Sequence, residues 1–188
     1  MATTADIRNG LVINYNSVLF QIVEFQHVKP GKGNAFVRTK LKNLSTGKVI
    51  DNTFSSGANI FPVRVERREF QFLYKDEVGF NFMDNETFDQ ITLGEELVDK
   101  ADLMKDGQVV EVLINTENEA ALTCELPPFV ELTVTYAEPG IRGDTANSPK
   151  KPVNVESGAR IMVPLFVEEG EKIRIDTRTY EYVERVKQ

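Results

Sequence analysis

The sequence contains one cysteine (Cys124), one histidine (His27) and no tryptophan among its 188 residues. A single cysteine cannot form an intrachain disulfide, and a single histidine cannot build a multi-histidine metal site. The same counts exclude Ser-His-Asp and Cys-His nucleophiles, apart from arrangements that would use His27. Paired carboxylates and metal-ligand clusters do not stand out either. We therefore expect no catalytic residue and no metal, and a small-molecule enzyme is the least favoured class.

Long apolar stretches are also missing. The longest runs, such as residues 161–167, are far shorter than the ~20 residues that span a bilayer. The first ten residues lack the basic region and apolar core of a secretion signal. These absences predict a cytoplasmic protein that does not associate with membranes. A hydrophobic share of 41% with 27% charged residues is typical of a folded globular chain.

The net charge of −7 is distributed unevenly along the chain. Residues 1–64 carry +5, residues 65–127 carry −11 and residues 128–188 carry −1. Between Glu24 and Asp51 lie six cations and no acid. Because contact with phosphate depends on local charge, this stretch is a candidate nucleic-acid surface. A merely basic surface strand is an equally good interpretation of the charge alone.

Apolar and polar residues alternate through most of the chain, which predicts half-buried strands. Residues 11–16 and 18–25 indicate a hairpin around Ser17. In 35–43, the alternation places Arg38, Lys40 and Lys42 on one solvent face, where we expect this stripe to contact RNA phosphates. The remaining predicted strands are 48–54, 68–75, 78–84, 108–115, 120–126, 130–137, 160–167, 171–177 and 180–186.

One segment, 92–104, has a different period. Its apolar residues recur every three to four positions, as on one face of a helix: Leu93, Leu97, Ala101 and Met104. Thr92 with Glu95 matches a capping box. The spacing therefore predicts a helix over this segment.

Breaks near residues 64 and 127 divide the chain into three units: 1–64, 65–127 and 128–188. Each contains several short strands with almost no helix between them. This pattern favours small β-barrels over a parallel sheet, and the predicted fold class is all-β.

The segment HVKPGKGNAF (27–36) joins two predicted strands. Lys32 stands between Gly31 and Gly33, whose missing Cβ atoms allow positive φ and a narrow tip, and Pro30 stiffens the entry. The spacing predicts a thin finger with a primary amine at its end. A Walker-type phosphate loop is excluded because a glycine and then a strand follow the lysine. For PGKG alone, a hairpin with a solvated lysine is the simpler interpretation.

The finger is the first of an ordered series of motifs through which the sequence resembles bacterial elongation factor P. The series comprises KPGKGNAF (29–36), VERREFQFLYKD (65–76), FMDNETF (82–88), PPFVEL (127–132), GDTA (143–146), VPLFV (163–167), GEKIRIDTR (170–178) and YVER (182–185). The resemblance spans essentially the whole chain. The sequence departs from the family pattern at Tyr180, where glycine is usual, and at Phe88, where tyrosine is frequent.

The resemblance implies a KOW/SH3-like barrel followed by two OB-fold barrels, in an L-shaped, tRNA-like arrangement. It implies a monomeric translation factor that binds the 70S ribosome between the peptidyl and exit tRNA sites and promotes peptide-bond formation at consecutive-proline stalls. The implied partners are rRNA, peptidyl-tRNA and the mRNA codon in the exit site. No cofactor is implied, and the chain is not an enzyme, because the chemistry belongs to the ribosome.

By the same resemblance, Lys32 corresponds to the tip residue that reaches the CCA end of the peptidyl-tRNA. In many members a modifying enzyme extends this residue covalently, so the resemblance makes Lys32 a candidate modification site. Pro30, Gly31 and Gly33 correspond to the loop that presents it.

Two further sets of residues follow from the resemblance. Gly143, Asp144 and Thr145 match the third-domain loop that faces the exit-site codon, and Tyr182 and Arg185 match positions that contact the tRNA body. Two alternatives stay open: a paralogue with different stalling targets, and an OB-fold single-strand nucleic-acid binder. The latter would need exposed aromatic rings on which bases stack.

Overall fold

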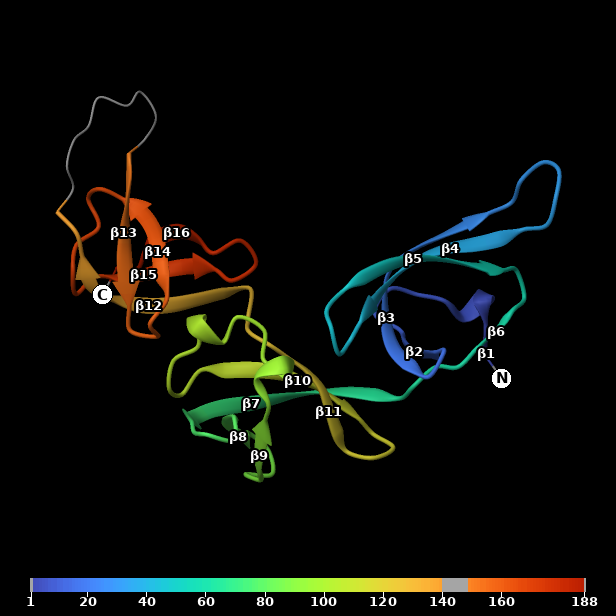
Figure 1. Cartoon of the computed structure of the whole chain (residues 1–188), viewed down its shortest axis with the longest axis horizontal. Coiled ribbons are helices and arrows are strands. Elements are labelled where there is room, and N and C mark those ends of the chain that lie inside the picture. The colour runs from blue at the N-terminus through green and yellow to red at the C-terminus, as the bar shows by residue number, and fades with distance from the viewer. Residues whose placement is uncertain (1, 140–148, 188) are drawn as a thin grey trace. The chain divides into compact units, whose positions relative to one another are not determined.

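The computed structural model describes residues 2–139 and 149–187, which form β-strands and short 3-10 helices (Figure 1). This confirms the predicted all-β class. The chain forms two compact units: Met1–Arg68 with Val112–Thr123, and Glu69–Glu111 with Cys124–Gln188. In the described part of the chain, no helix has the length and apolar character needed to cross a membrane.

The first sheet is antiparallel and has the order β2-β3-β4-β5, with β2 (Val12–Tyr15), β3 (Val18–Val28), β4 (Phe36–Asn43) and β5 (Val49–Ser55). The hairpin predicted around Ser17 is confirmed. Asn16 and Ser17 have φ values of 53° and 63°, as a two-residue turn between twisted strands requires. Strands β1 (Ala2–Thr3) and β6 (Asn59–Ile60), which precede and follow this sheet in the sequence, form a short antiparallel ladder with each other. The core against which the first sheet packs comprises Ile7, Ile13, Phe20, Ile22, Val37, Leu41 and Ile60.

The second sheet has the order β11-β10-β7-β8-β9. Its strands are β7 (Val65–Lys75), β8 (Phe80–Asp84), β9 (Gln90–Leu93), β10 (Val109–Asn115) and β11 (Ala120–Glu125). Phe72 packs against Phe80 and Phe82, with ring centroids 6.0 and 5.5 Å away, so aromatic contacts join β7 to β8.

The third sheet has the order β14-β13-β12-β15-β16 and lies within the second unit. Its strands are β12 (Phe129–Ala137), β13 (Lys150–Val155), β14 (Arg160–Pro164), β15 (Lys172–Asp176) and β16 (Glu181–Arg185). The two edge strands β14 and β16 contact each other, so the sheet closes nearly into a barrel. Inward-facing residues such as Leu132, Val163 and Ile173 are fully buried.

The helix predicted over 92–104 is wrong. The segment begins in strand β9 and continues as two 3-10 helices, η2 (Glu95–Leu97) and η3 (Ala101–Leu103). Thr92 does not cap a helix, because its hydroxyl donates to Asn81 Oδ1 at 2.7 Å within the sheet. Lys100 adopts a left-handed conformation with φ of 57°, which interrupts any continuous helix.

Strand β13 was not predicted from the sequence. Two lysines open it and Pro152 lies inside it, a combination that reads as a loop. The predicted strands at the other positions are confirmed with small shifts of their ends.

We predict that Leu41→Ala lowers the free energy of unfolding by about 2–5 kcal/mol, because Leu41 is fully buried in the first core and the change leaves a cavity. Val49→Ala, on the neighbouring strand but half-exposed, should cost less than about 0.5 kcal/mol. Denaturant unfolding measures both. Equal losses would contradict the assignment of Leu41 to the core.

Candidate nucleic-acid interface

The register of β3 against β4 determines which residue occupies the tip of the finger. The two strands pair antiparallel up to Val28 opposite Phe36, and Lys32 lies midway between this last pair. Nearer the base, the register shifts between Ile22 and Glu24, where Val23 is the extra residue of a β-bulge. In Figure 1 the hairpin of β3 and β4 extends beyond the end of β5 and carries the connecting loop at its tip.

The loop places the Lys32 side chain in solvent. Gly33 has a φ of 107°, which side chains with a Cβ rarely adopt, so glycine is required there. Gly31 does not have positive φ, and a Cβ at this position would meet open space. The expectation that both glycines supply positive φ is thus confirmed only for Gly33. Within the described residues, the Lys32 amine has no hydrogen-bond or ion-pair partner.

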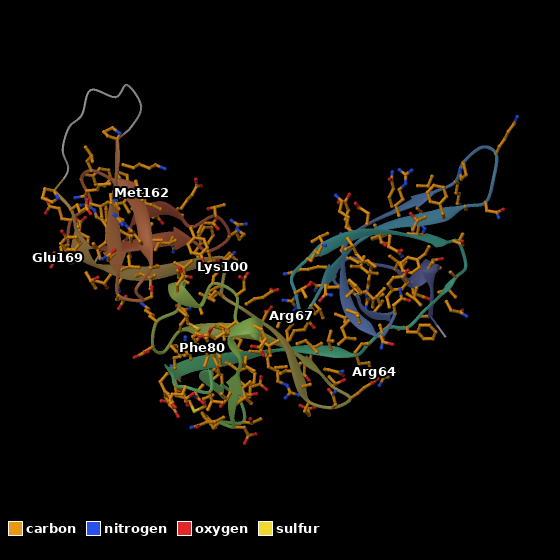
Figure 2. The ribbon with its side chains drawn as sticks, viewed as in Figure 1. Arg64, Arg67, Phe80, Lys100, Met162 and Glu169 are labelled. Carbon is orange, nitrogen blue, oxygen red and sulfur yellow. The ribbon has the colours of Figure 1, made fainter. Side chains whose placement is uncertain are left out.

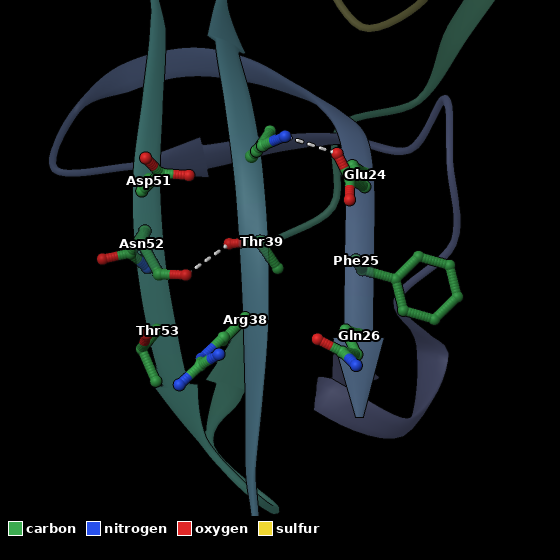
Figure 3. Close-up of a pocket in the computed structure, with 9 residues that line it drawn as sticks. Glu24, Phe25, Gln26, Arg38, Thr39, Asp51, Asn52 and Thr53 are labelled. Carbon is green, nitrogen blue, oxygen red and sulfur yellow. Dashed lines mark hydrogen bonds and ion pairs between the residues drawn. The ribbon is translucent and has the colours of Figure 1, made fainter. Parts of the chain in front are cut away.

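The predicted stripe does lie on one face of β4. Arg38 and Lys40 are exposed and Lys42 is half-buried, whereas Val37, Thr39 and Leu41 are buried on the opposite face. Cross-strand pairing builds two rows on the outer face (Figure 3): Gln26, Arg38 and Thr53 form one, and Glu24, Lys40 and Asp51 form the other.

The positive charge of Lys40 is already balanced by acidic neighbours. Its ammonium nitrogen lies 2.7 Å from Glu24 Oε2, and this hydrogen bond, followed by the Glu24 charge, raises the pKa of Lys40. Asp51 faces Lys40 from the other side. This pairing was not predicted from the sequence, although a hairpin symmetric about Lys32 brings Glu24 opposite Lys40. The two acids that bound the basic stretch in sequence therefore flank one of its cations in space.

Arg38 has a different environment. Its guanidinium carbon lies 5.5 Å from the centre of the Phe36 ring, and its cross-strand neighbours Gln26 and Thr53 are uncharged. Gln26, Arg38 and Thr53 line a groove of about 330 Å³, whose lining also includes Glu24, Lys40 and Asp51 of the neighbouring row. A planar guanidinium beside an amide and a hydroxyl offers several donors to one anion, as phosphate recognition requires. Within the stripe, Arg38 is the cation best placed for a phosphate.

The other predicted contact residues belong to the third predicted unit, 128–188. Gly143, Asp144 and Thr145 fall outside the described residues. Tyr182 and Arg185 are on β16 in the second unit, whereas the finger belongs to the first. Tyr182 is half-buried against the core of the third sheet, and this burial raises the pKa of its phenol. Arg185 is exposed and its guanidinium lies 2.6 Å from Glu171 Oε1, so contact with RNA would compete with this ion pair.

Two other kinds of site, a nucleophilic cysteine and a metal-binding cluster, are poorly supported by the described residues. Cys124 is buried, and burial raises the pKa of its thiol to about 12, so the thiol is protonated and unreactive at neutral pH. His27 is exposed and packs edge-to-face on Phe25 with ring centroids 5.6 Å apart. Over residues 2–139 and 149–187, no cluster of three or more His, Cys, Asp or Glu could hold a metal ion.

Three family models match successive parts of the chain. Residues 3–60 match the elongation factor P KOW-like domain, residues 65–122 the elongation factor P OB domain and residues 130–185 the elongation factor P C-terminal domain. Each match lies inside one predicted unit; the unit boundaries themselves stay a prediction. KOW-like and OB barrels agree with the curled sheets of the structure.

Curated relatives match over the full length. Elongation factor P of Amoebophilus asiaticus is 59% identical and covers 100% of this chain and 98% of the relative. Elongation factor P 1 of Porphyromonas gingivalis and elongation factor P of Flavobacterium johnsoniae are 54% and 55% identical, each with 100% of both chains covered. A solved structure of eukaryotic translation initiation factor 5A from Methanococcus jannaschii matches at 19% identity with a TM-score of 0.48, covering 67% of this chain and 90% of that one.

The two glycines of the tip provide a matched test of the loop geometry. We predict that Gly33→Ala destabilises the loop by about 1–2 kcal/mol, because alanine is strained at positive φ. Gly31→Ala should leave the loop unchanged, since it meets open space without positive φ. Amide chemical shifts of residues 28–36 measure both effects, and equal perturbation by the two variants would contradict this loop conformation.

Proposed function

The chain belongs to the elongation factor P family, and on this premise we propose that it binds the ribosome between the peptidyl and exit tRNA sites and promotes peptide-bond formation at consecutive prolines. As a member of this family it is a translation factor. The proposed partners are the 70S ribosome, its rRNA, the peptidyl-tRNA and, through Gly143, Asp144 and Thr145, the exit-site codon. The proposed activity takes place in the cytoplasm, where ribosomes translate.

One observation carries this proposal: the exposed amine of Lys32, which has no partner among residues 2–139 and 149–187, lies at the midpoint of a two-stranded finger. Lys32 is exposed, four residues from the last strand pair on each side, and glycine flanks it on both sides. A tip without adjacent Cβ atoms can enter a confined site. Its amine can then donate up to three hydrogen bonds to phosphate or ribose oxygens.

The proposed mechanism is orientation rather than covalent catalysis. Proline reacts poorly because its ring restricts the geometry of attack. If Lys32 contacts the CCA end of the peptidyl-tRNA, it restricts that end to a reactive pose and lowers the entropic part of the barrier. Proton transfer and bond formation stay with the ribosome, so the protein needs no catalytic residue of its own. A covalent extension of Lys32 by a modifying enzyme would lengthen the reach of the same amine.

The face of β4 supports binding of the RNA backbone. Arg38 offers its guanidinium within an uncharged row, whereas Lys40 is held by Glu24. Phosphate contacts fix the position of a protein on RNA without reading sequence. Arg38 would therefore help to align the finger along the tRNA.

A single-strand nucleic-acid binder is less well supported. Such a protein stacks successive bases on neighbouring aromatic rings. Among the described residues, the exposed aromatic side chains are dispersed along the sequence: Phe61, Tyr74, Phe88, Phe129, Tyr136, Phe166 and Tyr180. A paralogue with other stalling targets would share every feature described above, and activity measurements separate it from the proposed factor.

We predict that Lys32→Ala folds normally but loses most of its activity on messages with consecutive prolines. The side chain lies in solvent and contributes to no core, so the free energy of unfolding should change by less than about 0.5 kcal/mol. Peptide output in a purified translation system, with protein isolated from its own source, measures the activity. Lys29→Ala is the matched control, because it removes the same charge from the exposed base of the loop. Full activity of Lys32→Ala would contradict the proposed function.

We predict that Arg38→Gln weakens ribosome binding several-fold and lowers the slope of log affinity against log salt by about one, as expected for one lost phosphate contact. Lys40→Gln removes the same charge but should have a smaller effect on both, because Glu24 already binds that ammonium. Titrations at several salt concentrations compare the variants. A larger effect of Lys40→Gln would show that phosphate displaces Glu24, contrary to this account.

A further inference from the structure

The turn between β15 and β16 contains an unusual backbone conformation. Tyr180 has a φ of 59°, in the left-handed region that favours glycine. Its amide donates to the Asp176 carbonyl at 2.9 Å, and the Arg178 amide donates to Asp176 Oδ1 at 2.9 Å. These bonds close the turn. A non-glycine residue in this conformation calls for a compensating interaction elsewhere.

That interaction joins the turn to a distant part of the sequence. The Tyr180 hydroxyl donates to Asp102 Oδ1 at 2.9 Å, and Asp102 lies in η3, 78 residues earlier. Burial, followed by the hydrogen bond to Asp102 and the charges of Asp102 and Asp99, raises the pKa of Tyr180 to about 12. The phenol therefore remains protonated and able to donate at neutral pH.

The η3 helix and the residues that follow it make two more contacts with the third sheet. Leu103 is fully buried within its core, together with residues such as Val130, Leu132 and Ile175. The Lys105 ammonium donates to the Glu131 carbonyl at 2.7 Å and lies 3.5 Å from Glu156. Lys100, labelled in Figure 2, turns the chain into η3 through its left-handed backbone. All of these residues belong to the second compact unit.

The three contacts have different physical characters. Burial of Leu103 is favourable but non-directional, so alone it would allow η3 to rotate on the third sheet. Hydrogen bonds depend on angle, and those of Asp102 and Lys105 lie on either side of Leu103 in sequence. Together they define an orientation as well as an attachment.

We propose that Tyr180 and Asp102 form a clasp that fixes the orientation of the third sheet on the η3 segment within the second compact unit. The clasp thereby positions Tyr182 and Arg185, which follow the turn directly on β16. The positioning role rests on the proposed function; the clasp itself does not. Tyr180 and Asp102 are positioning residues, because they act through β16 and touch no RNA in this account.

The test compares four variants of the full chain. Tyr180→Phe keeps the ring and the strained backbone but removes the donor, and Asp102→Ala removes the acceptor. Asp102→Asn keeps an acceptor oxygen and should restore the clasp. Tyr136→Phe is the matched control, because it removes the hydroxyl of an exposed tyrosine on β12.

The first measurement is hydrogen exchange of the Leu103 and Met104 amides, which donate to Lys100 and Ala101 within η3. Tyr180→Phe and Asp102→Ala should accelerate it about two- to ten-fold, the range expected for one net hydrogen bond. Residual dipolar couplings should then show that the η3 segment and the third sheet no longer share one alignment. Asp102→Asn and Tyr136→Phe should behave as wild type. Unchanged exchange and one shared alignment in all four variants would overturn the clasp.

The second measurement is ribosome affinity. Tyr180→Phe should weaken binding several-fold while Tyr136→Phe does not, since Tyr182 and Arg185 lose their fixed orientation. Suppose that the η3 segment and the third sheet of the Tyr180→Phe protein no longer share one alignment. Wild-type ribosome affinity of that protein would then overturn the positioning role. A wild-type protein that failed to bind ribosomes would instead contradict the proposed function, and the first measurement would still decide on the clasp.

Discussion

The candidate interface depends on one constraint, the register of β3 against β4. Because strand side chains alternate, a slip of one residue would exchange outward and inward faces. The bulge at Val23 sets this register: Phe20 and Ile22 face the core before it, and Phe25 packs against the core after it. The bulge therefore brings Lys32 to the tip and places Glu24 beside Lys40.

The register also controls the electrostatics of the face. Acids flank Lys40, whereas Arg38 and the tip amine lack carboxylate partners within the described residues. Within the hairpin, Arg38 and the tip amine of Lys32 are thus better placed to contact RNA than Lys40 is. The neutralised Lys40 lies nearer the base than Arg38, so this arrangement favours aligned binding at the outer part of the hairpin over indiscriminate attraction along its whole length. β4 has hydrogen-bonded partners on both sides, which gives the finger a firm base.

Much of the fold and the finger could be predicted from the sequence. Alternation indicated the strands, and glycines around Lys32 indicated the tip, because both signals are local. The segment 92–104 could not be predicted, since Thr92 bonds to Asn81 across a sheet and Lys100 adopts positive φ, and neither leaves a local signature. The pairing of Tyr180 with Asp102 links positions 78 residues apart and depends on tertiary structure alone. The pairing of Glu24 with Lys40 could have been found from hairpin symmetry about Lys32.

The central claim is that the finger delivers Lys32 to the reacting end of the peptidyl-tRNA. A cryo-electron-microscopy reconstruction of this protein on a ribosome paused at consecutive prolines tests it most directly. The account predicts the Lys32 amine within about 3 Å of a phosphate or ribose oxygen of the CCA end, with Arg38 facing the tRNA backbone. A reconstruction with the protein bound elsewhere, or with the finger directed into solvent, would contradict it.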